Sequence, residues 1–321
     1  MPAPLSLPDL AVGAHVEETF LVWDVEQRTQ SDGNPFVILT LANASGRVKT
    51  APFWSSDLPK VEGVAKGTVV SVVADLGMYR SDRQLKVASL RPLPRGTVDW
   101  SRLLPSIGDV APWWRKVEEW RGETADGPFR RAVALCYDDP DFRSRYEQCP
   151  ASLGNHHAEL GGLLKHTVEV GVIARQIAKT CGAVWDVVLA GVLLHDIGKL
   201  EAYRWDGPFA MTEAGSLLGH VVLGSLMLDR RLDETDEPVV TERERLVLQH
   251  LVLSHHGELQ FGSPVRPMTL EAEVLHAADS ASASTANLAA ALREDANFDE
   301  GETVSRPIWS LDRRRVYRGP A

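Results

Sequence analysis

The chain has 321 residues, of which 44% are hydrophobic and 24% charged, and its formal net charge at pH 7 is −10. The length fits two ordinary domains better than one, and the composition is that of a soluble globular protein. An acidic chain is poorly suited to tight, non-specific binding of duplex nucleic acid, because such binding relies on many lysine and arginine contacts to phosphate.

The N-terminus and the cysteines indicate a cytoplasmic protein. The first ten residues, "MPAPLSLPDL", lack the basic start and apolar core of a signal peptide. No segment reaches the ~18 uninterrupted apolar residues that a membrane helix needs. The three cysteines are widely spaced, which fits neither a disulfide framework nor a zinc motif. We therefore expect a reducing cytoplasm and no membrane partner.

The first hundred residues alternate between apolar and polar side chains in five short runs. These runs span residues 15–29, 35–44, 46–54, 67–80 and 83–93. A helix-like segment, "SSDLPKVEG", follows the third run. Five strands with a helix after the third are typical of an OB-fold barrel, although a small β-sandwich shows much the same pattern. We assign residues 1–95 to this all-β domain.

Beyond a linker at residues 96–110, the apolar spacing becomes helical. Helices are expected at residues 111–121, 127–136, 139–147, 160–180, 186–196, 215–230, 241–256 and 269–293. No second run of clear strands follows, so residues 111–311 should form an all-α domain. Residues 312–321, which contain "DRRRVYR", are interpreted as a basic C-terminal tail.

Histidines and aspartates recur on the apolar faces of the predicted helices. Nine of the ten histidines lie between residues 156 and 276. His195 and Asp196 end the nearly apolar run "DVVLAGVLL". The rest of the set is His166, His220, His255, His256 and Asp279. A lone histidine on such a face is more often a hydrogen-bonded core residue, but five helices that each present an imidazole or carboxylate favour a shared site.

Two buried aspartates among histidines are most simply tolerated if divalent cations balance their charge. Imidazole and carboxylate without thiolate argue against a structural zinc site and favour Mn²⁺, Fe²⁺, Co²⁺, Ni²⁺ or Mg²⁺. The number of ligands favours two ions bridged by Asp196, an arrangement suited to phosphoryl chemistry. Lys199, one turn after His195, could hold a substrate phosphate; the alternative is an exposed lysine at a helix end.

The pattern of His166, His195-Asp196 and Asp279 resembles the H…HD…D signature of the HD phosphohydrolase superfamily. The phrases "NHHAELGGLLKHT", "VLAGVLLHDIGKL", "LLGHVVLG" and "LSHHGELQFGSPVRPMTLEAEVLHAAD" are more specific. With an OB-like domain in front, they are similar to the YhaM-type 3′-5′ exoribonucleases from about residue 12 to residue 310. The resemblance implies a multidomain protein, with an N-terminal OB-fold barrel followed by an HD-superfamily domain.

The resemblance also implies roles for individual residues. One metal would be held by His166, His195, Asp196 and Asp279. The second would be completed by His220 and His255, with His256 nearby, and Mn²⁺ is the favoured ion. His156 and His157 would approach the substrate, or else are loop histidines. After Asp279 the chain runs "SASASTANLAAAL", which departs from the expected pattern and leaves that wall of the site open.

The front domain would then guide a single strand, because OB folds stack bases on aromatic rings beside a basic groove. Residues 1–105 carry 11 acidic and 11 basic side chains, which predicts only modest affinity. The expected contacts are Phe53, Trp54, Tyr79, Arg47 and Lys49. Further candidates are Phe36, Arg80, Arg83 and Lys86.

The leading interpretation is a metal-dependent exoribonuclease that hydrolyses single-stranded RNA to nucleoside monophosphates. Its catalytic residues would be His195, Asp196 and Lys199. One alternative is an HD hydrolase that acts on small or cyclic nucleotides. Another is a nucleic-acid-binding protein whose metal is only structural. Single-stranded DNA as a substrate and assembly into a homo-oligomer both stay open.

Overall fold

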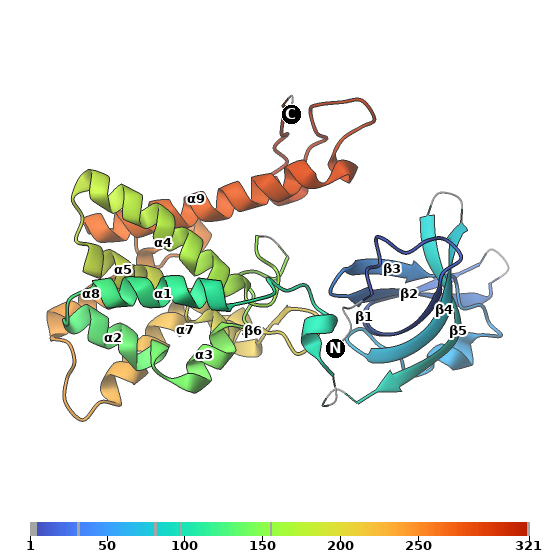
Figure 1. Ribbon diagram of the computed structural model, residues 1–321, viewed down its shortest axis with the longest axis horizontal. Coiled ribbons are helices and arrows are strands. Elements are labelled where there is room, and N and C mark those ends of the chain that lie inside the picture. The colour runs from blue at the N-terminus through green and yellow to red at the C-terminus, as the bar shows by residue number, and fades with distance from the viewer. Residues whose placement is uncertain are drawn as a thin grey trace. The chain divides into compact units, whose positions relative to one another are not determined.

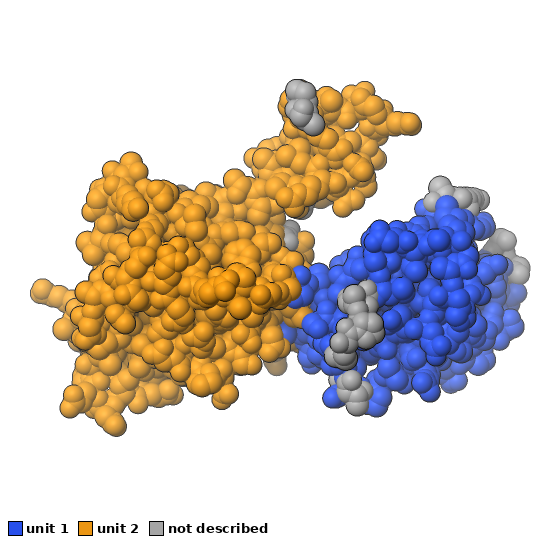
Figure 2. Space-filling model, in the orientation of Figure 1, with its two compact units in different colours: residues 1–106, 205–208 blue, residues 107–204, 209–321 orange. Residues whose placement is uncertain are grey.

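The computed structural model describes residues 5–30, 33–79, 82–94, 96, 98–154 and 156–319. The chain divides into two compact units (Figure 2). Unit 1 contains residues 1–106 and 205–208, and unit 2 contains residues 107–204 and 209–321. Among the described residues, no helix combines the length and the apolar character needed to cross a membrane.

Unit 1 is a closed barrel of five strands in the order β1-β2-β3-β5-β4. The strands are β1 (His15–Thr29), β2 (Pro35–Asn43), β3 (Gly46–Thr50), β4 (Val69–Tyr79) and β5 (Asp82–Leu93), and the short 3₁₀ helix η1 (Leu58–Val61) follows β3. The closed sheet confirms the predicted OB-like barrel and excludes the alternative sandwich (Figure 1). A parallel pairing of β3 with β5, at Lys49 with Gln84 and Thr50 with Leu85, closes the barrel.

The apolar residues of the alternating pattern fill the interior of the barrel. Phe20, Leu39, Leu41, Val72 and Leu85 are fully buried in one apolar cluster. A bulge in β1 between Val22 and Asp24 shifts the register against β2, and an extra residue in β5, Ala88, shifts the register against β4 between Val73 and Ala74. Such bulges increase local twist and help a short sheet to close on itself.

Unit 2 is mainly helical, as predicted. Its helices are α1 (Ala111–Glu123), α2 (Pro128–Tyr137), α3 (Pro140–Tyr146), α4 (Gly162–Cys181), α5 (Trp185–Leu194), α6 (Lys199–Ala202), α7 (Glu213–Asp233), α8 (Glu242–Ser254) and α9 (Leu270–Arg293). Local signals fix many of the starts: α1, α2 and α3 begin with proline in the first turn, and threonine side chains cap α7, α8 and α9. A small hairpin, β6 (Tyr203–Arg204) and β7 (Ala210–Met211), lies between α6 and α7.

Helix α5 forms the centre of unit 2. Every residue from Val188 to Leu194 is buried, and α5 packs against α4, α8 and α9. Gly191 lies so close to Leu251 and Leu275 that a side chain there would press on both. Because α5 is enclosed in this way, the residues that follow it emerge inside the domain.

A small lobe follows α9, which projects beyond the other helices toward it (Figure 1). We define the C-terminal lobe as residues 294–319. Its core contains Phe298, Ile308, Leu311 and Val316, which pack on Ala291 at the end of α9. Val304 pairs with Tyr317 and Ile308 with Arg314 in antiparallel bridges. The basic segment 312–318 is therefore part of a folded structure, whereas residues 320–321 lie outside the described residues.

Candidate metal centre

Asp196 lies in the turn that joins α5 to α6. The helix ends at Leu194, His195 occupies the C-cap, and the backbone N–H of Lys199 donates to the carbonyl of Asp196 at 3.0 Å. Asp196 is only 1% exposed. Gly198 makes this turn possible, because a Cβ there would overlap the backbone of His220 and Gly224 in α7. The apolar helix thus ends by placing a carboxylate inside the domain.

The two carboxylate oxygens of Asp196 face different groups of side chains. Oδ2 lies 3.3 Å from His195 Nε2 and 3.6 Å from His166 Nε2. Oδ1 lies 3.3 Å from His220 Nε2 and 3.7 Å from His255 Nε2. Asp196 therefore stands between two pairs of imidazoles, with one oxygen directed to each pair.

Asp279 joins the first group from α9. Its Oδ1 lies 3.0 Å from His166 Nε2. On the other side of the same ring, His166 Nδ1 lies 3.3 Å from the hydroxyl of Ser282. Ser282 follows Asp279 by three residues and so shares its helix face, which was the available signal for a contact that the sequence interpretation missed.

Backbone carbonyls fix the orientation of several rings. His195 Nδ1 donates to Val192 O at 2.8 Å, and His255 Nδ1 donates to Val252 O at 2.7 Å. His256 Nδ1 donates to Phe261 O at 2.7 Å. A carbonyl can only accept, so each Nδ1 carries the hydrogen and each Nε2 offers a lone pair. This tautomer is the one in which Nε2 binds a metal.

Four buried polar atoms meet at Asp196 without a hydrogen-bond partner among the described residues: His195 Nε2, His220 Nε2, His255 Nε2 and Asp196 Oδ1. Leaving a buried acceptor unsatisfied costs about 1–3 kcal/mol. Two sets of three residues have ligand atoms within 4.8 Å of one another: His166 with His195 and Asp196, and His220 with His255 and His256. The donors and their geometry fit divalent metal ions.

The electrostatics of the site favour the metal-binding forms of His220, His255 and Asp196. Burial lowers the pKa of His220 to about 3 and holds the pKa of His255 well below its usual value, so both rings are neutral. Burial opposes ionisation of Asp196, but the charges of Lys199 and His195 outweigh it and keep its pKa far below the ordinary range. His195 differs: burial opposes its protonation, yet the Asp196 carboxylate raises its pKa.

Lys199 is buried beside Asp196 instead of exposed at a helix end. Its Nζ lies 2.5 Å from Asp196 Oδ2. Burial disfavours the ammonium form, but Asp196 more than compensates and raises the pKa of Lys199. A permanent cation therefore stands at the oxygen that also faces His166 and His195.

The two preceding histidines have different surroundings. The ring centroid of His156 lies 5.2 Å from that of His166, and its buried Nδ1 has no hydrogen-bond partner in the described part of the chain. His157 Nε2 instead lies 2.7 Å from Glu169 Oε2. His156 is thus the one that approaches the site with an unused ring nitrogen, while His157 is held by a carboxylate.

In unit 1 the aromatic residues proposed to contact substrate fall into two classes. The prediction for Phe53 was wrong: it is 3% exposed and packs in the barrel core, so a base cannot stack on it. Trp54 is 43% exposed and Tyr79 59% exposed. The ring centroid of Phe36 lies 5.0 Å from that of Trp54.

The basic residues of the barrel are partly engaged. The guanidinium of Arg47 lies 3.6 Å from the ring centroid of Trp23, an aromatic residue that the sequence interpretation missed. Lys49 Nζ lies 2.6 Å from Glu26 Oε1. Arg83 donates to the carbonyls of Pro8 and Leu10, and Arg80 lies outside the described residues.

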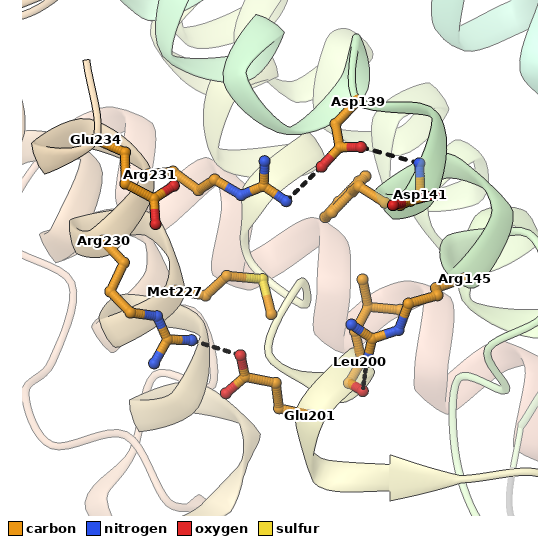
Figure 3. A pocket seen from close by; sticks show the side chains of 10 residues that line it. Asp139, Asp141, Arg145, Leu200, Glu201, Met227, Arg230, Arg231 and Glu234 are labelled. Atoms are coloured by element: carbon orange, nitrogen blue, oxygen red, sulfur yellow. Dashed lines mark hydrogen bonds and ion pairs between the residues drawn. The ribbon is translucent and has the colours of Figure 1, made fainter. Parts of the chain in front are cut away.

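A cavity of about 360 Å³ lies elsewhere on unit 2, between α3, α6 and α7 (Figure 3). It is lined by charged pairs, including Arg231 with Asp139 at 2.6 Å and Arg230 with Glu201 at 2.5 Å. At its edge Arg145 donates to the carbonyl of Leu200 at 2.5 Å. None of the candidate metal ligands lines this cavity, but the bonds of Arg230 and Arg145 reach α6, which carries Lys199.

Comparison with known proteins agrees with this geometry. The family model described as HD domain matches residues 163–284, a range that includes each proposed metal ligand. The 3′-5′ exoribonuclease YhaM of Bacillus subtilis (strain 168) is 30% identical over 314 residues, which cover 96% of each chain. The chain belongs to the YhaM family.

Two further relatives carry the same name. The 3′-5′ exoribonuclease YhaM of Geobacillus sp. (strain WCH70) is 30% identical, with 96% of this chain and 93% of the relative covered. That of Bacillus velezensis is 29% identical, with 96% of each chain covered. Membership of the YhaM family confirms the resemblance that the H…HD…D pattern and the two-domain order indicated.

Proposed function

We propose that the protein is a metal-dependent 3′-5′ exoribonuclease that releases nucleoside monophosphates from single-stranded RNA. The main observation in support is that the two carboxylate oxygens of Asp196 face two separate pairs of histidines. Family membership supports this activity, because the relatives are named 3′-5′ exoribonucleases.

Two divalent ions would share Asp196. His166, His195 and Asp279 would hold the first, and His220 and His255 the second, with His256 beside it. His255 is the better ligand of the last two, because it is fully buried and its Nε2 has no hydrogen-bond partner among the described residues. The absence of thiolate from this set favours Mn²⁺, with Co²⁺, Fe²⁺, Ni²⁺ and Mg²⁺ as alternatives.

A pair of bound divalent ions supplies an activated water and stabilises negative charge on the phosphoryl group during an in-line displacement. The residues of the chain set up that chemistry. His195 and Asp196, positioned at the end of α5, would be ligands, and the ammonium of Lys199 would meet charge that develops on the phosphoryl oxygens. His156 would face the substrate at the entrance, and His157 would support it.

The barrel would bind the strand that leads to this site. Trp54 and Tyr79 expose ring faces on which bases can stack, and Arg47 and Lys49 add cations on one strand. Single-stranded DNA offers the same stacking and phosphate contacts, so it is a second possible substrate for the same machinery.

Product analysis with end-labelled oligonucleotides tests this function. Purified protein with Mn²⁺ should shorten 5′-labelled RNA step by step and should release the label of 3′-labelled RNA as a mononucleotide at once. Parallel reactions with DNA and with cyclic dinucleotides define the substrate class. Release of mononucleotides from the 5′ end, or hydrolysis of cyclic dinucleotides alone, would contradict the proposal.

A further inference from the structure

The C-terminal lobe exposes two aromatic rings although it has a folded core. Trp309 is 83% exposed and Tyr317 61% exposed, while their neighbours Ile308 and Val316 are buried. A tryptophan ring carries more apolar surface than any other side chain, and such rings are enriched where a partner binds. These two rings are thus available for contact with a ligand.

Three consecutive arginines, residues 313–315, accompany the rings. All three are exposed, and none has a carboxylate within ion-pair distance in the part of the chain that the structure describes. The other arginines of the lobe differ: Arg306 pairs with Asp299 at 3.4 Å and Arg318 with Asp295 at 2.8 Å. The lobe thus neutralises two of its arginines and leaves three cations unpaired.

The turn at residues 312–313 sets one of these cations against an aromatic face. Asp312 and Arg313 have φ values of 52° and 59°, in the left-handed region that non-glycine residues rarely adopt. The N–H of Arg313 donates to Ile308 O at 2.9 Å and holds the turn. The guanidinium of Arg313 lies 5.4 Å from the ring centroid of Trp309, which is cation–π range.

Exposed rings beside unpaired arginines match single-stranded nucleic acid. Every base has a face that stacks on an aromatic ring, and each nucleotide carries a phosphate that an arginine can meet. The chain as a whole has a charge of −10, so a polyanion needs local basic surfaces to be held. We define the lobe surface as Trp309, Arg313, Arg314, Arg315 and Tyr317.

The length of α9 between Asp279 and the start of the lobe sets the scale for an RNA that reaches both. Asp279 and Arg293 both lie on α9, fourteen residues apart. At a rise of about 1.5 Å per residue this is about 21 Å. At about 3.4 Å per nucleotide, as in one strand of a duplex, the span corresponds to about six nucleotides.

We propose that the lobe surface is a second binding site for the substrate, which holds single-stranded RNA several nucleotides upstream of the 3′ end at the metal centre. This inference rests on the proposed exoribonuclease function for its substrate. It adds a site within unit 2 that is formed by residues other than the proposed metal ligands.

Steady-state kinetics on RNAs of two lengths tests the lobe surface in the full-length protein. Trp309→Ala and Arg315→Glu should each raise KM for a 20-nucleotide RNA, by about 5-fold or more for the tryptophan, since stacking is worth ~1–3 kcal/mol per base. The kcat on the 20-mer and both constants on a 4-mer should not change. Trp309→Phe, which keeps a ring, should recover most of the binding.

Arg243→Glu, the same charge reversal at an exposed arginine of α8, is the matched control and should leave KM unchanged. A KM for the 20-mer that stays at the wild-type value in Trp309→Ala and Arg315→Glu would overturn the inference. So would an equal loss on both RNA lengths, or a change of oligomeric state in sedimentation, which would mark a contact between two copies of the chain.

Fluorescence anisotropy separates this inference from the proposed function. It measures the binding of a labelled 20-nucleotide RNA to protein from which a chelator has removed the metal ions, so that the RNA is not hydrolysed. Weaker RNA binding by Trp309→Ala than by wild type would support the lobe surface even if the wild-type protein failed to hydrolyse RNA. Equal binding would count against the surface even if hydrolysis were confirmed.

Discussion

Asp196 is the residue that lies between the two pairs of histidines, with one carboxylate oxygen facing each pair. Asp196→Asn removes the charge and leaves a neutral amide, with a similar shape, among buried imidazoles. A bound divalent ion supplies several kcal/mol of transition-state stabilisation and each ~1.4 kcal/mol is tenfold in rate, so kcat should fall by about 10³ or more.

Circular dichroism should show the Asp196→Asn protein folded, because α5 is held by apolar packing. His250→Gln is the control: His250 Nε2 accepts the N–H of Met268 at 2.9 Å, outside both groups of candidate ligands. This variant should keep wild-type turnover. Substantial turnover by Asp196→Asn with Mn²⁺ in excess would refute a bridging role.

Lys199→Met tests the role of the buried ammonium. The substitution keeps most of the side-chain volume and removes the ammonium that lies 2.5 Å from Asp196. An ammonium is no metal ligand, so metal content should stay at the wild-type level while kcat falls by about 10²–10³, as for other groups that meet developing charge. Metal analysis beside kinetics decides the matter, and loss of the ions would show that Lys199 holds Asp196 in place instead.

The sequence indicated which side chains gather around Asp196, but not the groups that orient them. His166, His195 and His255 share apolar helix faces, and that periodicity is visible in one dimension. The carbonyls that orient His195 and His255 carry no sequence signal, because every residue has one. The prediction that Phe53 contacts substrate failed for a related reason. Phe53 follows the end of β3, where strand alternation no longer indicates which side chains point into the barrel.

Among the elements of unit 2, the joint between α5, α6 and α7 leaves no room for a side chain at Gly198. Gly198 has ordinary helical dihedrals, so only contact with the α7 backbone requires glycine there. Gly198→Ala should destabilise the protein by about 1–3 kcal/mol, the usual range for overpacking. It should also lower metal occupancy, because the same turn positions Asp196.

Gly122→Ala is the matched control for this prediction. Gly122 lies in α1 with open space where a Cβ would be added, and alanine in a helix is favoured over glycine by up to about 1 kcal/mol. Thermal melting of both variants compares them directly. Equal melting temperatures for Gly198→Ala and the wild type would mean that the joint can relax.

Most helices and strands were predictable, including the short η1, but α6 and the β6–β7 hairpin were not. The predicted helices differ from the observed ones by a few residues at their ends, since each has apolar residues spaced by three and four. Helix α6 has four residues and strands β6 and β7 have two each, so none of them is long enough to repeat a pattern. The break in α7 at Gly219, with φ 75° in the left-handed region that favours glycine, re-aims the chain just before His220.

In the whole molecule, we assign hydrolysis to unit 2 and binding of the RNA strand to the barrel. All proposed ligands lie in unit 2, and the barrel carries the exposed rings Trp54 and Tyr79. The double change Trp54→Ala and Tyr79→Ala should raise KM for a 20-nucleotide RNA, with stacking worth ~1–3 kcal/mol per base. Hydrolysis of bis-p-nitrophenyl phosphate, a single diester without a nucleic-acid strand, should not change.

Val12→Ala, at another exposed apolar residue of unit 1, controls for the loss of surface area alone. Equal losses on RNA and on the small diester in the double variant would instead give the barrel a purely structural role.

The count of bound metal ions tests the central claim most directly. Mass spectrometry of Mn²⁺-loaded protein after gel filtration should find two ions per chain in the wild type, as a bridging carboxylate with two histidine groups implies. His166→Asn and His220→Asn should each retain one, because each removes a ligand from a different ion. A single ion in the wild-type protein, or a count that His220→Asn leaves unchanged, would contradict two ions bridged by Asp196.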